Sequence, residues 1–337
     1  MSKLGSLKLP LLILAIVLLV LLPADLTGMG LPWPGLKRYG IYILSLWLVT
    51  AIAAMGVNLI VGYAGQETLA QAAFLGIGAF TTALLTKAGI PFFLAFLASG
   101  VLAFIVGILL GFPALRVQKQ YLAFVTLAFS VFAWLVIRNE DWLTGGVSGM
   151  AVDRPVILGL SFKPALTFYW FTLAVTALLT FAMWWLLASP WGRAFTALRE
   201  NPIRAESLGI DVRDYTLLAF AIGSGYGGFA GALYAPLVEF IDPAPFALAP
   251  SLLYLLMVVV GGAGSFIGPF IGAGVAVLLP EWLRFAEDYY LVIYAAMVIA
   301  LMAFCPTGIV GLIERLLTPR RRPHADDKGP ALSEAKP

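Results

Sequence analysis

The chain is poor in the residues that build redox, metal and hydrolytic sites. It has one cysteine, Cys305, and one histidine, His324, in 337 residues. A single cysteine excludes an internal disulfide, and a lone histidine in a polar tail leaves no His/Cys cluster for zinc and no Ser/His/Asp set. The G-x-x-x-x-G-K-[ST] motif is also absent, so we expect no nucleotide to bind through a P-loop. These absences predict a protein that does no bond chemistry of its own.

Charge is scarce as well, at 12% of the residues, whereas 61% are hydrophobic and the mean hydropathy is +0.96. A soluble domain is normally about 25% charged. Apolar stretches near the roughly 20 residues that cross a bilayer recur along the whole chain. We therefore predict an all-α, polytopic transmembrane helical bundle with about ten spans, at 7–24, 40–62, 68–86, 91–113, 119–138, 165–188, 216–238, 247–263, 265–283 and 288–305.

The first apolar stretch has two interpretations. Lys3 and Lys8 precede it, as in a signal peptide, but Pro23-Ala24-Asp25 is a poor cleavage site, and we favour a retained span. We divide the chain into an N-terminal span with its external connection (1–39), a transmembrane core (40–312) and a disordered cytoplasmic tail (313–337), which is rich in Pro, Lys, Asp and Ser.

The basic residues indicate an orientation. Ten crossings place both termini and residues 189–215 on one side, which carries the larger basic set and is therefore the cytoplasm by the positive-inside rule. That set includes Arg116, Lys119, Arg315 and Arg320–Arg322. Four basic residues fall outside and count against the orientation: Lys37, Arg38, Arg138 and Arg154.

Residues 189–215 are unusually polar for a connection between two spans, with four arginines and four acids. Ser189–Pro190 and Asn201–Pro202 each pair an N-cap residue with proline at the first helical position, and Gly209 supplies a C-terminal stop. We predict two short helices at the membrane surface. Because a lipid-embedded chain has little reason to build them, we also predict that a soluble partner docks there and drives or gates the protein.

Glycines recur at four-residue spacing, which lines one helix face with small residues and lets helix backbones approach closely. We predict helix-packing roles for Gly76, Gly78, Gly227, Gly231, Gly264, Gly268 and Gly272. Val61-Gly-Tyr-Ala-Gly65 also resembles Val260-Gly-Gly-Ala-Gly264, both at the inner end of an inward-running span. This similarity leaves a parallel internal repeat open.

Polar residues within the spans indicate a candidate translocation path, because an unpaired polar group at membrane depth is costly. We assign to this path Asn58, Gln66, Thr68, Gln71, Thr126 and Ser130. Glu67 has two interpretations, a solvated acid in a surface loop or the coupling site of an ion-driven carrier. Thr172, Thr176 and Thr180 are expected to bond to the carbonyl four residues earlier, which is a structural role.

Several segments follow the order found in the permeases of branched-chain amino-acid ABC importers. They are Asn58–Gln66, Ala72–Phe80, Tyr121–Phe129, Leu143–Gly146, Gly192–Ala194, Leu198–Asn201, Ala205–Glu206, Leu208–Ile210, Gly261–Pro269 and Pro306–Ile309. The chain resembles this family from about residue 40 to 312. Its long N-terminus and its 198–210 loop resemble the second, M-type permease of such importers.

The resemblance implies partners that the residues alone do not give. They are a sister permease, two cytoplasmic ATPase subunits that bind ATP and Mg²⁺, and a periplasmic or extracellular solute-binding protein. No cofactor is implied in this chain, and no nucleic acid. The protein would be a multi-pass subunit of a prokaryotic inner membrane with both termini cytoplasmic. In such importers a short cytoplasmic helix fits a groove on the ATPase, and the residues that match it are Arg199, Glu200, Asn201, Ala205, Glu206 and Gly209.

Some positions depart from the family pattern. The family commonly has Gly-His at Ala70-Gln71, a small or apolar residue at Glu67, and Gly-Glu at Ser130-Val131. Because these positions lie near the presumed path, hydrophobic amino acids, urea or short amides, and aromatic carboxylates all stay open as substrates. The rival classes are an ion-coupled secondary carrier that uses Glu67 and a scaffold subunit without a path.

Overall fold

The computed structural model describes residues 37–114, 119–157, 160–162, 164–282 and 308–317, and isolated positions between 289 and 299. The predicted spans 7–24 and 288–305, the signal-peptide question and most of the predicted tail lie outside the continuous ranges. Every predicted span from 40 to 283 corresponds to a helix. These are α2 (Arg38–Val57), continued by the π-helix η2 (Asn58–Tyr63), α3 (Gln71–Lys87), α4 (Phe92–Ala114), α5 (Lys119–Asn139), α7 (Ala165–Ala188), α10 (Val212–Val238), α11 (Leu248–Gly261) and α12 (Gly268–Trp282).

Five of the described helical segments are long and apolar enough to cross a membrane, at 38–63, 92–112, 121–139, 165–188 and 212–238. The helices α3, α11 and α12 are shorter, with 17, 14 and 15 residues. The polytopic helical bundle is therefore confirmed, while the number of ten spans stays a prediction.

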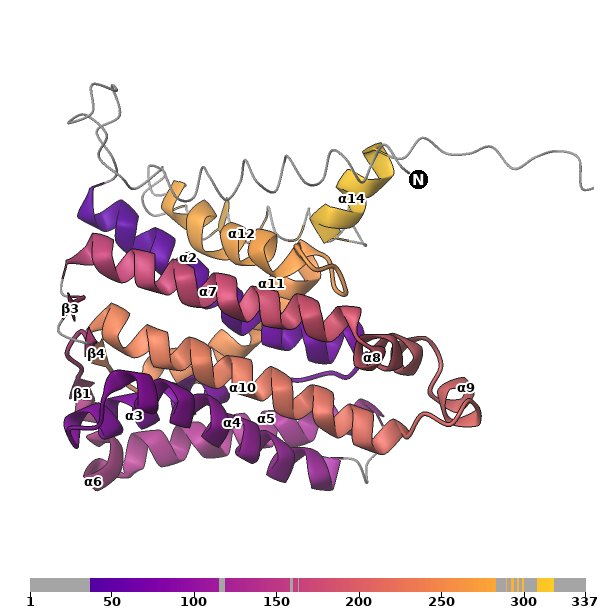
Figure 1. The fold of residues 1–337 in the computed structure, drawn as a ribbon, viewed down its shortest axis with the longest axis horizontal. Helices are drawn as coiled ribbons and strands as arrows, with labels where there is room; N and C mark the ends of the chain where they lie inside the picture. The colour runs from indigo at the N-terminus through magenta and orange to yellow at the C-terminus, as the bar shows by residue number, and fades with distance from the viewer. Residues whose placement is uncertain are drawn as a thin grey trace, which may run out of the picture.

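The centre of the bundle is formed by α2 and α10. In the most apolar stretch of each, 78% and 72% of the residues are buried, against 28–33% in α4, α5 and α7. The helix α10 packs against α2, α3 and α4, and in Figure 1 it lies between a layer containing α2 and α7 and a layer containing α3, α4 and α5. The outer helices therefore present the apolar surface that a bilayer or a neighbouring subunit would cover.

Glycines allow α10 and α3 to approach closely. A Cβ at Gly231 would lie against the backbone of Leu75 and 2.7 Å from the nitrogen of Ala79. A Cβ at Gly78 would lie 2.7 Å from the Cα of Gly228. Atoms also lie within 3 Å of a Cβ built on each of the other glycines assigned to packing, Gly76, Gly227, Gly264, Gly268 and Gly272.

The hairpin of α11 and α12 packs against α2, with α12 antiparallel to α2. Trp47 Nε1 donates a hydrogen bond to the Phe270 carbonyl at 2.9 Å, and the Tyr39 hydroxyl donates to Glu281 at 2.7 Å. The helices α2 and α11 thus run in the same direction. Each leads into a glycine-rich turn, which spans residues 62–65 where η2 ends and residues 261–264 where α11 ends. The helices that follow share a pattern, Phe74-Leu-Gly-Ile-Gly78 in α3 and Phe270-Ile-Gly-Ala-Gly274 in α12. This arrangement is consistent with the parallel internal repeat that the sequence left open.

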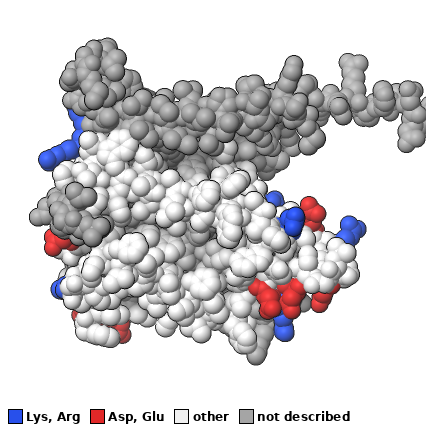
Figure 2. Space-filling model, in the orientation of Figure 1, with Lys and Arg blue, Asp and Glu red and all other residues white. Residues whose placement is uncertain are grey.

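The 139–164 connection covers the end of the bundle at which α2 and α7 begin. It contains α6 (Asp141–Thr144), the 3₁₀ turn η3 (Gly146–Ser148) and the short strands β1 (Met150–Ala151), β2 (Val156–Ile157) and β3 (Leu160–Ser161). β2 pairs with β3, and β1 pairs antiparallel with β4 (Phe240–Ile241), which follows α10 and precedes the 3₁₀ turn η4 (Ala244–Phe246). Charged side chains gather at this end and at the opposite one, with an uncharged surface between them (Figure 2).

The last described element is α14 (Gly308–Leu317). The predicted start of the disordered tail at residue 313 therefore falls inside a helix, and the folded part of the chain continues to Leu317. The rest of the predicted tail lies outside the described residues.

Candidate functional site

The two predicted surface helices are present as α8 (Pro190–Glu200) and α9 (Pro202–Ser207), at the end of the bundle opposite β1 and β4 (Figure 1). The Ser189 hydroxyl accepts a hydrogen bond from the Trp191 N–H at 3.2 Å, and the Asn201 side chain accepts from the Arg204 N–H at 3.1 Å. Gly209, with φ of 83°, follows α9. The caps and the stop predicted from the sequence are confirmed. They could be predicted because each depends on neighbouring residues alone.

The inner face of α8 is fixed to the bundle. Phe195 and Leu198 are fully buried, and the Phe195 ring packs edge-on against Tyr215 of α10 at 6.1 Å between centroids. A Cβ at Gly192 would collide with the backbone of Leu187 at the end of α7. A displacement of α8 would therefore be passed to α7 and α10.

The outer surface of α9 is apolar at two positions that the sequence analysis did not select. Ile203 is 79% exposed and Leu208, directly after the helix, is 80% exposed. They alternate with charged residues, among them Arg204 and Glu206. Exposed aliphatic side chains on a polar rim are typical of a contact surface for another protein.

Arg199 connects α8 with the interior. Its Nη1 donates to the Gly62 carbonyl at 2.5 Å, and a Cβ on Gly264 would lie against the same guanidinium. A Cβ on Gly65 would be 3.0 Å from Arg199 Cγ. One side chain of a surface helix thus touches both glycine-rich turns. The family resemblance implied that Arg199 belongs to the ATPase-coupling set. Its side chain is exposed overall, and its guanidinium reaches the Gly62 carbonyl.

Asn58 joins the two turns to each other. Its Nδ2 donates to the Ser265 carbonyl and its Oδ1 accepts from the Gly264 N–H, both at 2.8 Å. Asn58 opens η2, and π-helical turns within longer helices are frequent at functional sites. We refer to the contact region of Arg199, Asn58, Gly62, Gly264 and Ser265 as the junction.

The other predicted coupling residues take different positions. Glu200 and Glu206 are exposed, Ala205 is buried beneath α9, and Asn201 is the cap. Gly209 has open space around it. The exposed side chains that a partner could contact therefore include the two acids, Arg204 and the adjoining apolar pair.

The first turn of α3 begins inside the bundle, where hydroxyl groups satisfy its N–H groups. Leu69 N donates to Thr126 Oγ1 at 3.1 Å, and Ala72 N donates to Ser251 Oγ at 3.0 Å. Ser130 Oγ lies 3.4 Å from Ser251 Oγ. Without such partners a buried helix start is unfavourable. Sequence reasoning missed Ser251, although a serine inside an apolar run was a usable signal.

Gln71 is wedged between α2 and α10. Its Nε2 donates to the Ala53 carbonyl at 2.9 Å, and glycines make room for it, since a Cβ at Gly56 or Gly227 would lie 2.9 or 3.0 Å from that nitrogen. Its Oε1 is buried and has no hydrogen-bond partner among the described residues. An unpaired buried acceptor costs about 1–3 kcal/mol. Gln71 is therefore a predicted path residue with an unused acceptor.

The predicted path residues lie in buried surroundings, with Asn58 at the junction and Thr126 and Ser130 beside the start of α3. All six are buried: Asn58, Gln66, Thr68, Gln71, Thr126 and Ser130. Glu67, between Gln66 and Thr68, is exposed instead, and no carboxylate is buried among the residues whose burial is described. Glu67 is thus a solvated loop acid in this structure.

A bundle with an apolar perimeter and five described helices long enough to cross a bilayer is that of a multi-pass membrane protein. Residues 40–302 match the family model described as "Branched-chain amino acid transport system / permease component". The chain belongs to this permease family.

Curated relatives agree with this assignment. The chain is 32% identical over 308 residues to the high-affinity branched-chain amino acid transport system permease protein LivM of Escherichia coli (strain K12), across 84% of this chain and 72% of that protein. It is 28% identical over 273 residues to the autoinducer 2 import system permease protein LsrC of Salmonella typhimurium (strain LT2), across 77% of this chain and 74% of that protein. No solved structure matches the chain. The resemblance noted in the sequence is confirmed, and the protein is a multi-pass inner-membrane permease.

Proposed function

We propose that this chain is the M-type permease of an ATP-driven importer that carries a small hydrophobic amino acid, such as a branched-chain one, into the cytoplasm. ATP and Mg²⁺ are bound by two partner ATPases, and a sister permease and a solute-binding protein complete the complex. The permease family and the names of the LivM relatives support this assignment. The observation that carries the mechanism is the Arg199 side chain, which runs from the surface helix α8 to both glycine-rich turns.

The mechanism is alternating access coupled to movement of α8 and α9. Closure of the ATPases moves these helices, and Arg199 transmits the movement to the turns that follow α2 and α11. A hydrogen bond to a charged group contributes about 1.5–3 kcal/mol, enough to bias two packings of similar free energy. The backbone of the two glycine-rich turns changes conformation before the helices do, because the glycines have no side chains that would hold one arrangement.

The α8–α9 end faces the cytoplasm in this proposal, with both termini on that side, and the 139–164 connection faces outward. The solute path runs through the buried polar region around the start of α3. In that region Gln71 has the unused acceptor, which suits a weak and transient contact with a passing solute.

The exposure of Glu67 argues against the ion-coupled carrier. A proton-coupled carrier normally uses a carboxylate at membrane depth, whereas Glu67 is exposed.

Reconstitution tests the proposed function. The four kinds of subunit are placed in proteoliposomes, and uptake of labelled leucine is measured with ATP available to the ATPases. We expect uptake that needs ATP and the solute-binding protein and that persists when ion gradients are collapsed. Uptake that survives without ATP and stops with the gradient would establish the carrier instead. Competition by urea, an aromatic carboxylate and autoinducer 2 tests the substrate class.

The exposed apolar pair gives a more local prediction. Ile203→Asp should weaken binding of the ATPase about tenfold, because a charge replaces an aliphatic contact in the centre of the docking surface. The measurement is retention of the ATPase by immobilised permease. Since Ile203 is exposed, folding should be unchanged. Val147→Asp, at a 68% exposed aliphatic position at the other end, is the matched control. Equal retention of the ATPase by the two variants would show that α9 does not contact it.

A further inference from the structure

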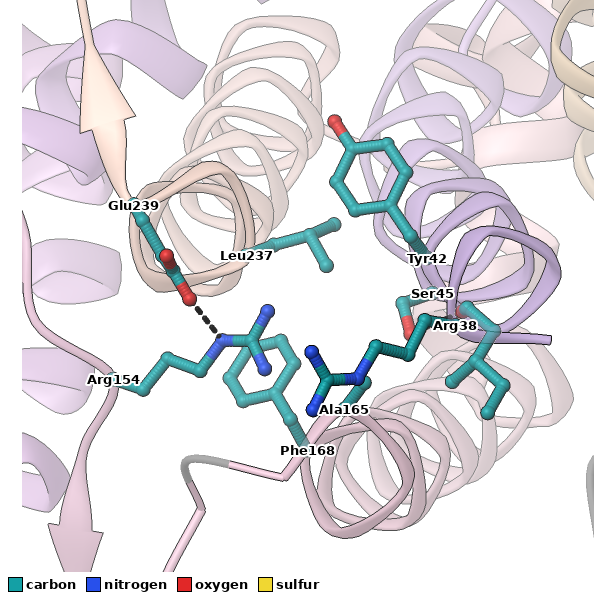
Figure 3. Close-up of a pocket in the computed structure, with 9 residues that line it drawn as sticks. Arg38, Tyr42, Ser45, Arg154, Ala165, Phe168, Leu237 and Glu239 are labelled. Carbon is teal, nitrogen blue, oxygen red and sulfur yellow. Dashed lines mark hydrogen bonds and ion pairs between the residues drawn. The ribbon is translucent and has the colours of Figure 1, made fainter.

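A cavity of about 310 Å³ lies at the end of the bundle opposite α8 and α9. It is placed where α2 and α7 begin and where α10 ends. Figure 3 shows the guanidinium groups of Arg38 and Arg154 approaching each other across it, with the Glu239 carboxylate beside Arg154. In the sequence, Arg38 and Arg154 counted only as exceptions to the positive-inside rule, and here they share one cavity.

The charges in this cavity favour an anion. Arg154 Nε is 2.7 Å from Glu239 Oε1, so one arginine is paired, and its guanidinium carbon lies 5.7 Å from the centre of the Phe168 ring. Arg38 has no ion-pair partner among the described residues. Two guanidinium groups that face each other repel, and a carboxylate between them would relieve that repulsion through charge-assisted, bidentate hydrogen bonds.

Glu239 adds a group that can receive a cation. Its side chain is 57% exposed, so its carboxylate is not fully occupied by Arg154. It is also the one non-glycine residue with a positive φ in the part of the chain that the structure describes, at 64°. Glu239 is the C-cap of α10, where glycine usually supplies this conformation, so a glutamate here adds a carboxylate to the cavity that the usual residue would lack.

The remaining walls combine apolar side chains with the hydroxyl-bearing Tyr42 and Ser45, and the space is small. Ile41, Phe168 and Leu237 contribute side chains to the lining. The volume is at the lower end of the roughly 300–1,000 Å³ typical of small-molecule sites. A ligand that fits should therefore be small, with one anionic group, one cationic group and an apolar part.

We propose that this cavity receives the transported solute on the outer side and recognises the zwitterion of an α-amino acid with an apolar side chain. The carboxylate lies between Arg38 and Arg154, the ammonium group faces Glu239, and the side chain packs on Ile41, Phe168 and Leu237. The proposal rests on the proposed function, since it assigns the substrate class to the end that would face the solute-binding protein. Binding at such a site is weak, because a tightly held solute would not move on.

The test measures binding without transport. The assembled permeases and ATPases are placed in phosphatidylcholine nanodiscs without nucleotide or binding protein, and ligand contact is followed by saturation-transfer NMR. The probes are L-leucine, L-leucinamide, which lacks the carboxylate, and 4-methylpentanoate, which lacks the amine. We expect leucine to bind, leucinamide to bind about tenfold more weakly, and Arg38→Gln to lower leucine affinity about tenfold. Lys87→Gln, an exposed charge at the end of α3, is the control and should change nothing.

Glu239→Gly separates ligand recognition from structure. Glycine suits the positive φ, so the variant should fold at least as well as the native chain. Leucine should bind more weakly to it, whereas 4-methylpentanoate, without an ammonium group, should bind as before or more tightly. An equal loss for both ligands would assign Glu239 a structural role and overturn the recognition of the amine.

Other outcomes also overturn the proposal. One is equal binding of leucine and leucinamide, and another is full leucine affinity in Arg38→Gln. Phosphatidylglycerol nanodiscs test an anionic lipid headgroup as the occupant, and loss of the Arg38-dependent leucine signal there would identify a lipid site. ATP-driven uptake is measured on the same preparations. If uptake is normal but no leucine binding depends on Arg38, the cavity is not the solute site and the proposed function stands. If the native assembly shows no uptake, the proposed function is wrong, and the NMR result alone decides whether the cavity binds leucine.

Discussion

Arg199→Ala should separate ATP hydrolysis from solute uptake. The substitution removes the hydrogen bond to the Gly62 carbonyl and the contact with the Gly264 turn, while the buried face of α8, with Phe195 and Leu198, stays intact. We expect ATPase binding and hydrolysis to persist and uptake to fall about tenfold or more, since a charge-assisted hydrogen bond is worth about 1.5–3 kcal/mol and each 1.4 kcal/mol is a factor of ten. Uptake per ATP in proteoliposomes is the measurement.

Arg193→Ala is the matched control for Arg199→Ala. Arg193 is exposed on the same helix and has no partner among the described residues, so its loss should leave coupling near normal.

A second variant alters the same contact at the glycine that faces Arg199. Gly264→Ala places a Cβ against the Arg199 guanidinium, whereas Gly89→Ala has the same positive φ, about 83° against 82°, and open space. If Gly264→Ala and Arg199→Ala both couple as well as their controls, the junction does not transmit the movement.

Gly231→Ala should destabilise the bundle by about 1–3 kcal/mol, the usual cost of overpacking. The added methyl group would meet the backbone of Leu75 and Ala79 in α3, and backbone cannot rotate away as a side chain can. The helices α10 and α3 would have to separate at the centre of the fold. The melting temperature of the purified complex, followed by tryptophan fluorescence, should fall by several degrees, at about 2–4 °C per kcal/mol for large domains.

The same helix supplies the control for Gly231→Ala. A Cβ at Gly225 would lie 3.5 Å from its nearest neighbour, which is an ordinary contact. Gly225→Ala should therefore stabilise α10 by roughly 0.5–1 kcal/mol, through the better helix propensity of alanine. Opposite signs for two identical substitutions on one helix would establish that the α10–α3 contact depends on missing side chains. A shift of the same sign in both variants would contradict it.

The sequence determined the features that depend on neighbouring residues. Hydropathy placed the helices between residues 40 and 283, and the Ser189–Pro190 and Asn201–Pro202 pairs placed the starts of α8 and α9. The threonines of α7 bond to the carbonyl four residues earlier as expected, with Thr176 at 2.7 Å and Thr180 at 2.6 Å. All of these follow from chain-local hydrogen bonds and from the transfer of apolar side chains out of water, so a short window of sequence contains the information.

Only the tertiary structure decided which distant groups meet. It placed the Arg199 guanidinium at Gly62 and Gly264, and it brought Arg38, Arg154 and Glu239 from three separate parts of the chain to one cavity. Such contacts depend on how helices pack across the whole fold, where a glycine at one position sets the separation of two backbones. No local pattern encodes that separation, and for this reason the sequence indicated a docking segment and a polar path but not the junction or the outer cavity.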